Sequence, residues 1–210
     1  AHQPAVKVED ISLFVNHAVV SEWERGLQNL RVINLKTNKS HRIQFPEPVY
    51  AASVSVNRVF DTPVVRYAYT SMVTPNSVFD YNMDTHKTTL VKETEVPGGF
   101  DRKNYVSERL FATAADGTKI PLSMVYKRGT KIDGTAPMLL YGYGSYGASI
   151  PPTFSSNRLS LLDRGVIYVI AHIRGGGELG EEWRSAGRMM NKMNTFTDFI
   201  AAAEHLIKNK

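Results

Sequence analysis

The chain has 210 residues, which is enough for one or two domains with a sizeable core. Apolar residues make up 42% of it and charged residues 21%, as in ordinary globular domains, and the net charge is +5. The absence of cysteine excludes disulfides, thiolate catalysis and cysteine-ligated zinc, and the scattered basic residues favour a solvated surface over a nucleic-acid interface.

The sequence also bears on location. It contains no run of about 18 apolar residues, so we expect no membrane span. The first residues, Ala1–Pro4, include neither an initiator Met nor an apolar signal core, so we expect the chain to be an internal piece of a longer protein. The lack of cysteine favours a reducing, cytoplasmic location and leaves a periplasmic one open. No cofactor and no metal is expected.

The N-terminal part of the chain, residues 5 to about 92, carries short strand patterns separated by tight turns. β-branched and aromatic residues are concentrated in these patterns, and helical periodicity is weak. The predicted strands span residues 11–15, 18–23, 30–35, 41–45, 64–70, 77–83 and 88–92.

Two of the turns between these strands resemble each other. Asn34–Lys39 aligns with Asn82–Lys87, 48 positions later, and the match includes Thr37 with Thr85. A repeat of about 40–50 residues with four strands per unit is typical of β-propeller blades. Because such turn residues are common, coincidence is the alternative.

The segment 93–100 contains Pro97 with two glycines after it and predicts a domain boundary. Beyond it, strand patterns at 107–114 and 119–126 flank Asp116-Gly117. An Asp-Gly turn between two strand patterns predicts a hairpin.

Two later segments, Met138–Leu140 and Val166–Ile173, are almost continuously apolar, as strands buried on both faces of a parallel sheet should be. A crossover containing Leu159, Leu161 and Leu162 joins them. Each strand leads into a glycine-rich loop, and ligands of open α/β sheets bind outside the carboxyl ends of the strands. Both loops therefore lie where chemistry is expected.

A helix is predicted at the end of the chain. Asn194 or Thr195 would cap it, with Asp198 completing a capping box. Apolar residues recur at helical spacing and predict one stripe that packs on a sheet face. The stripe consists of Phe196, Phe199, Ile200, Ala203, Leu206 and Ile207.

The two glycine-rich loops carry a specific resemblance. Tyr-Gly-Tyr-Gly-Ser-Tyr-Gly at 141–147 is followed by Arg-Gly-Gly-Gly-Glu at 174–178. In this order the motifs resemble the start of the catalytic domain of prolyl oligopeptidase-family serine peptidases, and the Ser145–Gly147 variant is most similar to the oligopeptidase B group. The resemblance implies a mixed β and α/β fold, with the C-terminal, closing blades of a β-propeller in residues 1–96. The N-terminal half of an α/β-hydrolase domain would follow in residues 97–210.

The same resemblance implies a serine-type endopeptidase that hydrolyses short peptides after Arg or Lys. Its partners would be peptide substrates and the remainder of the same polypeptide, with no nucleic acid and no membrane. Two alternatives stay open: proline-specific cleavage of the prolyl oligopeptidase type, and a non-catalytic binding module that kept the fold. A nucleophile motif shortly after Lys210 would decide for a peptidase.

The catalytic triad is missing from this sequence. It contains no Gly-x-Ser-x-Gly, the strand-to-helix turn that presents the nucleophile in this fold. Ser145 is the nearest serine, but Tyr143 stands where the first glycine should be. Because the triad follows the order Ser, Asp, His, the acid and the base would also lie downstream, and we expect the chain alone to be inactive. His172 lies in an apolar strand and is expected to be a satisfied core residue.

One catalytic group is nevertheless implied. In the prolyl oligopeptidase family the tyrosine between the two glycines of Tyr-Gly-Tyr-Gly donates its hydroxyl to the oxyanion, and the resemblance assigns this role to Tyr143. The alternative is a structural tyrosine at a strand end. Tyr146 matches a position that lines the substrate cleft and is the candidate substrate-binding residue.

The second motif is predicted to be structural. Its three glycines indicate close loop packing, and Arg174 and Glu178 are expected to form an ion pair or domain-interface contacts. A phosphate-binding loop is the alternative, but the chain has no Gly-x-x-x-x-Gly-Lys-Ser/Thr motif.

Overall fold

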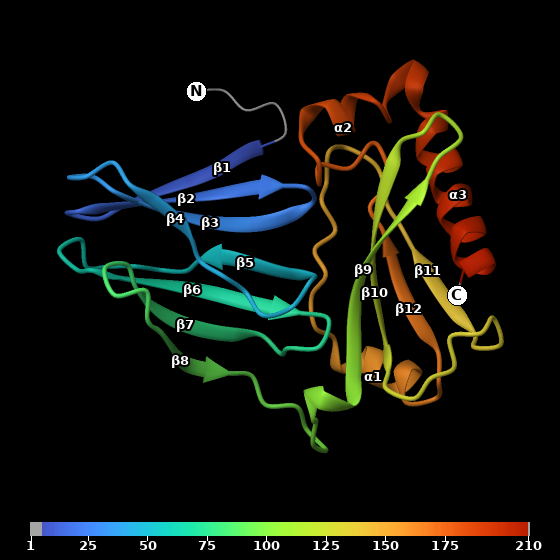
Figure 1. Cartoon of the computed structure of the whole chain (residues 1–210), viewed down its shortest axis with the longest axis horizontal. Helices are drawn as coiled ribbons and strands as arrows, with labels where there is room; N and C mark the ends of the chain where they lie inside the picture. The colour runs from blue at the N-terminus through green and yellow to red at the C-terminus, as the bar shows by residue number, and fades with distance from the viewer. Residues whose placement is uncertain (1–5, 210) are drawn as a thin grey trace.

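The computed structural model describes residues 6–209, and their strands form three four-stranded sheets. Two sheets lie side by side in the N-terminal half, and the third sheet forms the C-terminal half together with the helices (Figure 1). The features expected of Ala1–Pro4 lie outside the described residues.

The first two sheets are antiparallel meanders of four consecutive strands, as expected of propeller blades. Each of the seven predicted strand segments overlaps one of their strands, although 11–15 and 41–45 extend past the ends of β1 and β4. The remaining strand, β5, is not predicted by the sequence pattern. The first sheet consists of β1 (Val6–Leu13), β2 (His17–Glu24), β3 (Leu27–Asn34) and β4 (Ser40–Arg42), and the second of β5 (Tyr50–Val54), β6 (Val64–Ser71), β7 (Ser77–Asn82) and β8 (Thr88–Glu93).

The two similar turns have the same geometry, so the repeat is structural. The side-chain oxygen of Asn34 accepts hydrogen bonds from the backbone N–H groups two and three positions later at 3.0 Å each. The side-chain oxygen of Asn82 does the same at 3.0 and 2.9 Å. Four positions after each asparagine, Asn38 and His86 take φ values of 58° and 60°. Each asparagine therefore closes its hairpin by the same Asx turn.

One hydrophobic core joins the two blades. Val19, Leu30 and Val32 of the first sheet are buried against Val65 and Tyr67 of the second. Burial stabilises the fold by about 1.5–3 kcal/mol for each such side chain. Because the buried side chains of the two sheets contact one another, neither sheet has a complete core of its own within the described residues.

The third sheet has the order β11-β12-β10-β9. The hairpin predicted around Asp116-Gly117 is present, and β11 and β12 are parallel, as expected. The helix α1 (Ser156–Leu162) forms the crossover between them. The strands are β9 (Tyr105–Thr113), β10 (Lys119–Lys127), β11 (Met138–Tyr141) and β12 (Ile167–Ala171), with the short helix η1 (Arg102–Asn104) before β9.

The burial of the two parallel strands differs from the prediction. β12 lies between β11 and β10 and is buried, as predicted. β11 is at the edge of the described sheet, and Leu139 and Tyr141 are exposed there. The prediction of burial on both faces is therefore wrong for β11, because an apolar run alone does not distinguish a central strand from an edge strand.

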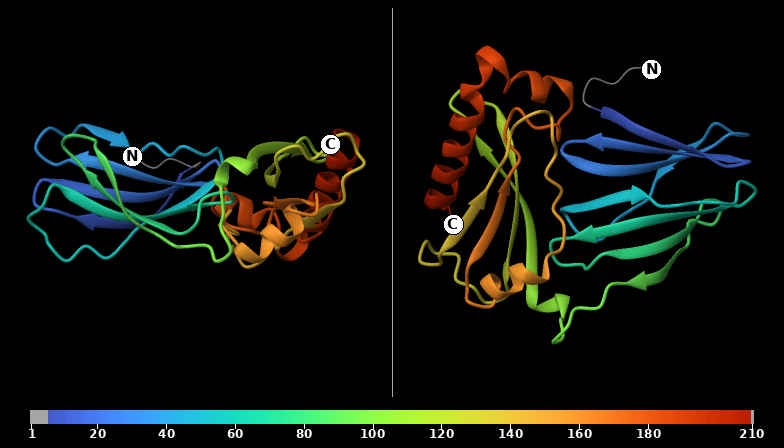
Figure 2. Two further views of the ribbon diagram at one scale, coloured as in Figure 1. Left: turned by 90° about the horizontal axis from the view of Figure 1, so that it is seen from below. Right: turned by 180° about the vertical axis from the view of Figure 1, so that it is seen from behind.

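The C-terminal helix α3 (Met193–Asn209) packs on one face of this sheet, against β9 and β10 (Figures 1 and 2). It begins before Asn194 and Thr195, so neither residue is its cap, contrary to the prediction. The helices α2 (Glu181–Ser185) and η2 (Met189–Asn191) precede it.

The buried face of α3 is also rotated from the predicted stripe. Thr195, Asp198, Ala202 and Leu206 are buried, whereas three members of the stripe are exposed: Phe196, Ile200 and Ile207. The physical reason is that Thr195 and Asp198 form hydrogen bonds with Arg174 on the buried side of the helix. The helix is therefore oriented with a partly polar face toward the protein interior.

The other face of the third sheet meets the blades. Val49, Met72 and Val73 from the second blade and its flanking loops form one buried cluster with Val125 and Ile170. The backbone N–H of Phe154 also donates to Thr70 Oγ1 of β6 at 3.1 Å. We call this contact the interdomain seam.

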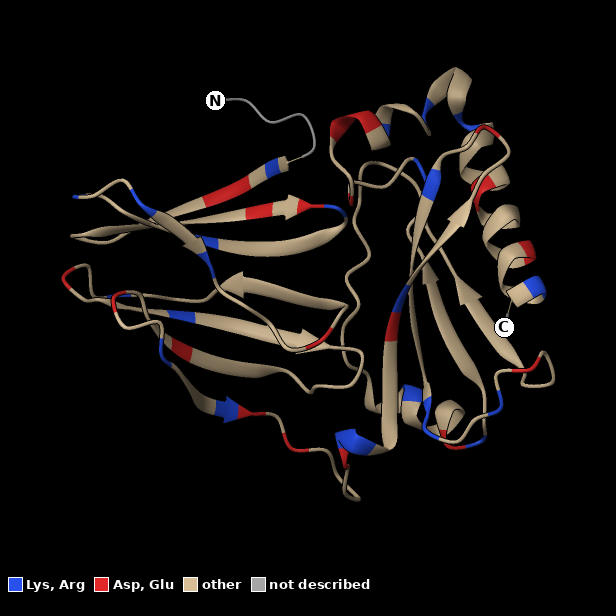
Figure 3. Cartoon of the chain, viewed as in Figure 1, with Lys and Arg blue, Asp and Glu red and all other residues tan. Residues whose placement is uncertain are grey.

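Charged residues of both signs are interspersed over both halves of the described chain, as the scattered positions in the sequence predicted (Figure 3). Within residues 6–209, no helix is both long enough and apolar enough to cross a membrane.

Candidate functional site

The two candidate tyrosines lie on the loop that follows β11, at the carboxyl end of a parallel strand. Tyr143 is 45% exposed, and Tyr146 is 90% exposed with a φ of 57°. Neither phenol oxygen has a hydrogen-bond partner among the described residues. Both hydroxyl groups are therefore available to a ligand.

The tyrosine loop packs directly on the loop that follows β12. A Cβ on Gly175 would lie 2.2 Å from the carbonyl oxygen of Gly144, and one on Gly177 would lie 2.3 Å from that of Gly147. The backbone N–H of Gly147 donates to the carbonyl of Gly175 at 2.9 Å. The prediction that these glycines mark close loop packing is confirmed, because no side chain fits between the two backbones.

Gly144 fixes the other side of the tyrosine loop. Its φ is +63°, and a Cβ there would lie 2.6 Å from both Ile173 and Thr195. Thr195 Oγ1 in turn donates to the carbonyl of Arg174 at 2.8 Å. The backbone after Tyr143 is thus held between the loop that follows β12 and α3.

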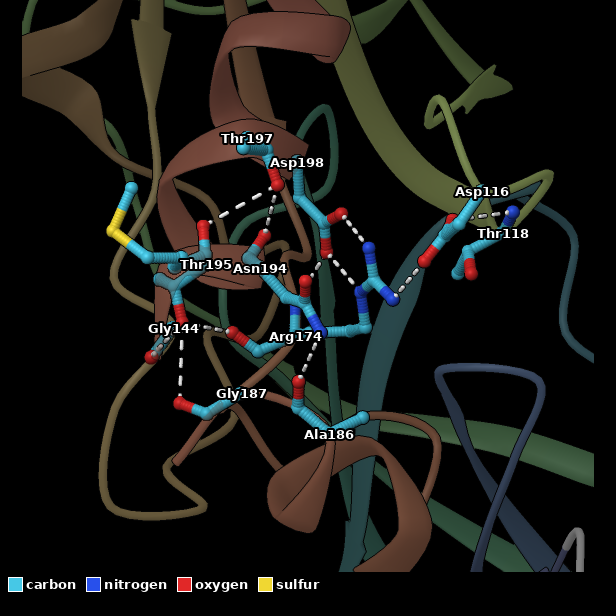
Figure 4. A network of polar contacts seen from close by, with 11 residues as sticks. Asp116, Thr118, Gly144, Arg174, Ala186, Gly187, Asn194, Thr195, Thr197 and Asp198 are labelled. Atoms are coloured by element: carbon cyan, nitrogen blue, oxygen red, sulfur yellow. Dashed lines mark hydrogen bonds and ion pairs between the residues drawn. The ribbon is translucent and has the colours of Figure 1, made fainter. Parts of the chain in front are cut away.

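The expected ion pair between Arg174 and Glu178 is absent, and Arg174 pairs with two aspartates instead (Figure 4). Its guanidinium donates to both carboxylate oxygens of Asp198, at 2.9 and 2.6 Å, and to Asp116 at 2.5 Å. The hydrogen bonds to Asp198 raise the pKa of Arg174. A backbone hydrogen bond from Thr118, followed by the one from Arg174, lowers the pKa of Asp116 to about 2. Local spacing could not reveal this pairing, since Asp198 follows 24 positions later on another element.

Glu178 instead belongs to a buried group around His172. His172 Nδ1 lies 3.4 Å from Glu178 Oε1, and His172 Nε2 lies 2.8 Å from Ser123 Oγ. Glu178 Oε1 also accepts from the backbone N–H of Ile150 at 2.9 Å. The order Ser–His–Glu is that of a hydrolytic triad, but the three residues are only 2–3% exposed. No substrate reaches them, so the expectation that His172 is a satisfied core residue is confirmed.

Sequence reasoning missed the residue that touches the tyrosine loop most closely. Lys192 Nζ donates to the carbonyl of Gly144 and to Ser145 Oγ, both at 2.7 Å, and to Thr195 Oγ1 at 3.2 Å. Lys192 lies between η2 and α3, 48 positions after Gly144, and no motif or periodicity connects them.

The described residues contain no cluster of His, Asp and Glu that could hold a metal ion. A surface hollow of about 700 Å³ is lined by blade residues such as Asn57, Arg66 and Asp80 and by neither tyrosine. The chemistry available at the tyrosine loop is therefore hydrogen-bond donation from an exposed phenol on a rigid backbone.

Two blades followed by the beginning of an α/β sheet define the chain as part of a propeller-bearing α/β hydrolase. Comparison with protein families identifies two domains of one family. The N-terminal β-propeller domain of prolyl oligopeptidase matches residues 1–94, and the prolyl oligopeptidase family matches residues 152–210. The chain belongs to the prolyl oligopeptidase family.

Named relatives are similar over nearly the whole chain. Dipeptidyl aminopeptidase BI from Pseudoxanthomonas mexicana is 46% identical over 99% of the chain, and protease 2 from Moraxella lacunata is 38% identical over 95%. The structure of oligopeptidase B from Trypanosoma brucei with covalently bound antipain is 41% identical over 99% of the chain, with a TM-score of 0.90. The chain spans 29% of each of the two relatives and 31% of the oligopeptidase chain.

Proposed function

We propose that the chain is part of a serine oligopeptidase that hydrolyses short peptides with a Ser–Asp–His triad in the rest of the polypeptide. Family membership and the names of the relatives support a peptidase. The observation that carries the proposal is Tyr143: its phenol is exposed, has no partner among the described residues, and stands on a backbone that packing holds in place. The chain alone is then inactive, since it has no nucleophile turn.

In this proposal the Tyr143 hydroxyl donates a hydrogen bond to the oxyanion of the tetrahedral intermediate. Such a donor acts in the transition state and not in the ground state, so it raises kcat rather than lowering KM. A loop held between the segment that follows β12 and α3 suits this role, because a fixed donor needs no reorganisation during the reaction.

Tyr146 is the proposed wall of the substrate cleft. It is three residues beyond Tyr143 on the same loop, and its 90% exposure leaves both ring faces free to contact a peptide. Cleavage after Arg or Lys is the specificity we favour, because the chain is similar to oligopeptidase B structures from two organisms. A dipeptidyl aminopeptidase or a proline-specific peptidase is the second candidate, since relatives with those names are similarly identical.

The domain boundary at 96/97 and a cytoplasmic location belong to the same proposal. The two family matches leave residues 95–151 uncovered, and β8 ends at Glu93, before the segment that contains Pro97. The lack of cysteine supports a reducing compartment.

Replacing one hydroxyl group tests the role of Tyr143. In the full-length parent, Tyr143→Phe keeps the ring, and we expect kcat to fall by about 10²–10³-fold with little change in KM. Tyr141→Phe is the matched control, because Tyr141 lies on β11, similarly exposed but before the loop. Steady-state kinetics on a short fluorogenic peptide measures both. Nearly full kcat in Tyr143→Phe, or a larger loss in Tyr141→Phe, would show that Tyr143 is only structural.

A further inference from the structure

The Lys192 ammonium group is engaged by the loop that carries Tyr143 and by α3. Its three acceptors are the carbonyl of Gly144, the hydroxyl of Ser145 and the hydroxyl of Thr195, at 2.7, 2.7 and 3.2 Å. A lysine ammonium has three N–H donors and no acceptor. Each N–H of the Lys192 ammonium group thus has an acceptor oxygen, and two of these oxygens belong to the two residues directly after Tyr143.

We propose that Lys192 is a positioning residue for oxyanion binding: it fixes the Gly144–Ser145 peptide group, one residue beyond Tyr143, and thereby the direction of the phenol. This inference rests on the proposed role of Tyr143. Lys192 itself touches neither substrate nor the reacting atoms.

The two glycines beside Tyr143 explain why the loop needs a residue that fixes its backbone. Gly142 and Gly144 flank Tyr143, and glycine has the widest backbone freedom of all residues. Packing against Ile173 and Thr195 limits Gly144 from one side. The Gly144 carbonyl, however, is oriented by a hydrogen bond from Lys192 at 2.7 Å. Thr195 Oγ1 lies 3.3 Å from the same carbonyl, but its proton has a closer acceptor in the carbonyl of Arg174, at 2.8 Å.

A small rotation of this peptide would be amplified at the phenol. The hydroxyl is at the far end of the tyrosine side chain, so a change in backbone direction displaces it further than it displaces the Cα. A misplacement of about 1 Å in a catalytic group lowers rate by about a hundredfold. Lys192 therefore affects kcat through Tyr143.

The short contact between Lys192 and Ser145 also fits a Ser–Lys pair in which the amine removes the serine proton. The surroundings of Lys192 argue against that chemistry. A base needs a free lone pair on nitrogen, whereas Lys192 Nζ has three acceptor oxygens within 3.2 Å, one for each N–H of an ammonium group. Ser145 is therefore an acceptor for Lys192 and not a nucleophile.

A double-mutant cycle in the full-length parent tests the inference. The variants are Lys192→Met, Tyr143→Phe and their combination, with Lys208→Met as the control, since Lys208 is exposed at the end of α3. Active sites are titrated with a serine-directed phosphonate, so that kcat refers to folded enzyme. We expect Lys192→Met to lower kcat by about tenfold to a hundredfold at nearly constant KM. In the Tyr143→Phe background, Lys192→Met should lower kcat by less than about threefold, because the hydroxyl group that Lys192 positions is already absent.

Each outcome is decisive. Equal losses of kcat in both backgrounds, or no loss in Lys192→Met, would overturn the positioning role while leaving Tyr143 in place. Full activity of Tyr143→Phe would instead overturn the proposed function of the tyrosine and this inference with it. Labelling of Ser145 by the phosphonate would overturn it by making Lys192 a base. If Lys192→Met does not fold, Lys192→Gln, which retains a donor and loses the charge, enters the cycle with an intermediate loss expected.

Discussion

Arg174 and Asp198 form a buried ion pair that joins the loop after β12 to α3. The Asp198 carboxylate also accepts the backbone N–H of Arg174, at 3.0 Å. The side chains are 7% and 0% exposed. A buried charge that loses its partner is costly, because water cannot replace the lost interaction. The pair therefore fixes α3, and with it Thr195, relative to the tyrosine loop.

Removing a carboxylate charge should destabilise the protein more at the buried partner of Arg174, Asp198, than at the exposed partner, Asp116. Asp198→Asn should lower the free energy of unfolding of the full-length parent by about 3–5 kcal/mol. Asp116→Asn is the control and should cost about 0–1 kcal/mol, since the Asp116 side chain is 49% exposed. Urea denaturation followed by fluorescence measures both. Equal effects of the two substitutions would mean that burial does not govern the strength of this network.

The stability of the two blades should depend on pH through His41. His41 Nε2 lies 2.8 Å from the hydroxyl of Tyr81, and its ring centroid lies 3.8 Å from that of His86, with the two rings tilted by 31°. Burial, followed by the charges of His86 and His17, lowers the pKa of His41 from 6.5. The unfolded chain thus binds a proton at a higher pH than the folded one, so this contribution to stability is complete above pH 6.5 and is lost as pH falls through the lower folded pKa.

The measurement is the thermal midpoint of the full-length parent between pH 8 and pH 5. His41→Gln should weaken the decrease in midpoint on acidification, because the neutral amide has no proton to gain. His205→Gln, on α3 and outside the blades, should leave the decrease unchanged. An unaltered pH profile in His41→Gln would contradict the assignment.

The contact between the two glycine-rich loops should not tolerate a methyl group. Gly175 and Gly165 both have positive φ, 95° and 80°, but only Gly175 has atoms within reach of a Cβ. Gly165→Ala should therefore lower the free energy of unfolding by about 1–2 kcal/mol, the cost of placing a residue with a Cβ at a positive φ. Gly175→Ala should lose about 1–3 kcal/mol more and lower kcat as well, because its methyl group would displace the carbonyl of Gly144.

Thermal unfolding and kinetics of these two glycine variants provide the comparison. If both lose the same stability and Gly175→Ala keeps its kcat, the loop beneath Tyr143 adapts more readily than the 2.2 Å approach implies.

The 210-residue chain in isolation should be inactive and should associate with itself. Within the described residues, β11 pairs on one side only, and its residues Leu139 and Tyr141 are exposed. Unpaired strand edges and exposed apolar side chains promote association. Light scattering and hydrolysis of Arg- and Lys-based fluorogenic peptides measure the two properties. A monodisperse monomer with a sharp thermal transition would instead favour a self-sufficient module.

Local patterns predicted most of the fold. The turns at Asn34 and Asn82 could be matched because an Asx turn is determined by adjacent residues. The hairpin at Asp116-Gly117 was recognisable for the same reason. β5 escaped prediction, because Tyr50–Val54 contains two alanines and follows two prolines within five residues, which weakens a strand pattern.

The site was only partly predictable. Tyr143 and Tyr146 could be named because a family motif contains them, and their catalytic roles stay predictions. The contacts that hold the loop, made by Lys192, Arg174 and Asp198, join positions far apart in sequence. The stripe predicted for α3 was partly wrong for the same reason: buried polar partners, which periodicity does not register, set the orientation of the helix.

The interdomain seam has a consequence for how the protein unfolds. Met72 and Val73 share one buried cluster with Val125 and Ile170, so the second blade and the third sheet lose apolar contacts together when either opens. We expect the slowest-exchanging amide hydrogens of β6 and β12 in the full-length parent to exchange with solvent in a single cooperative event. The unit that unfolds would then cross the domain boundary proposed at 96/97, and cutting the gene at Pro97 would split one foldon rather than separate two.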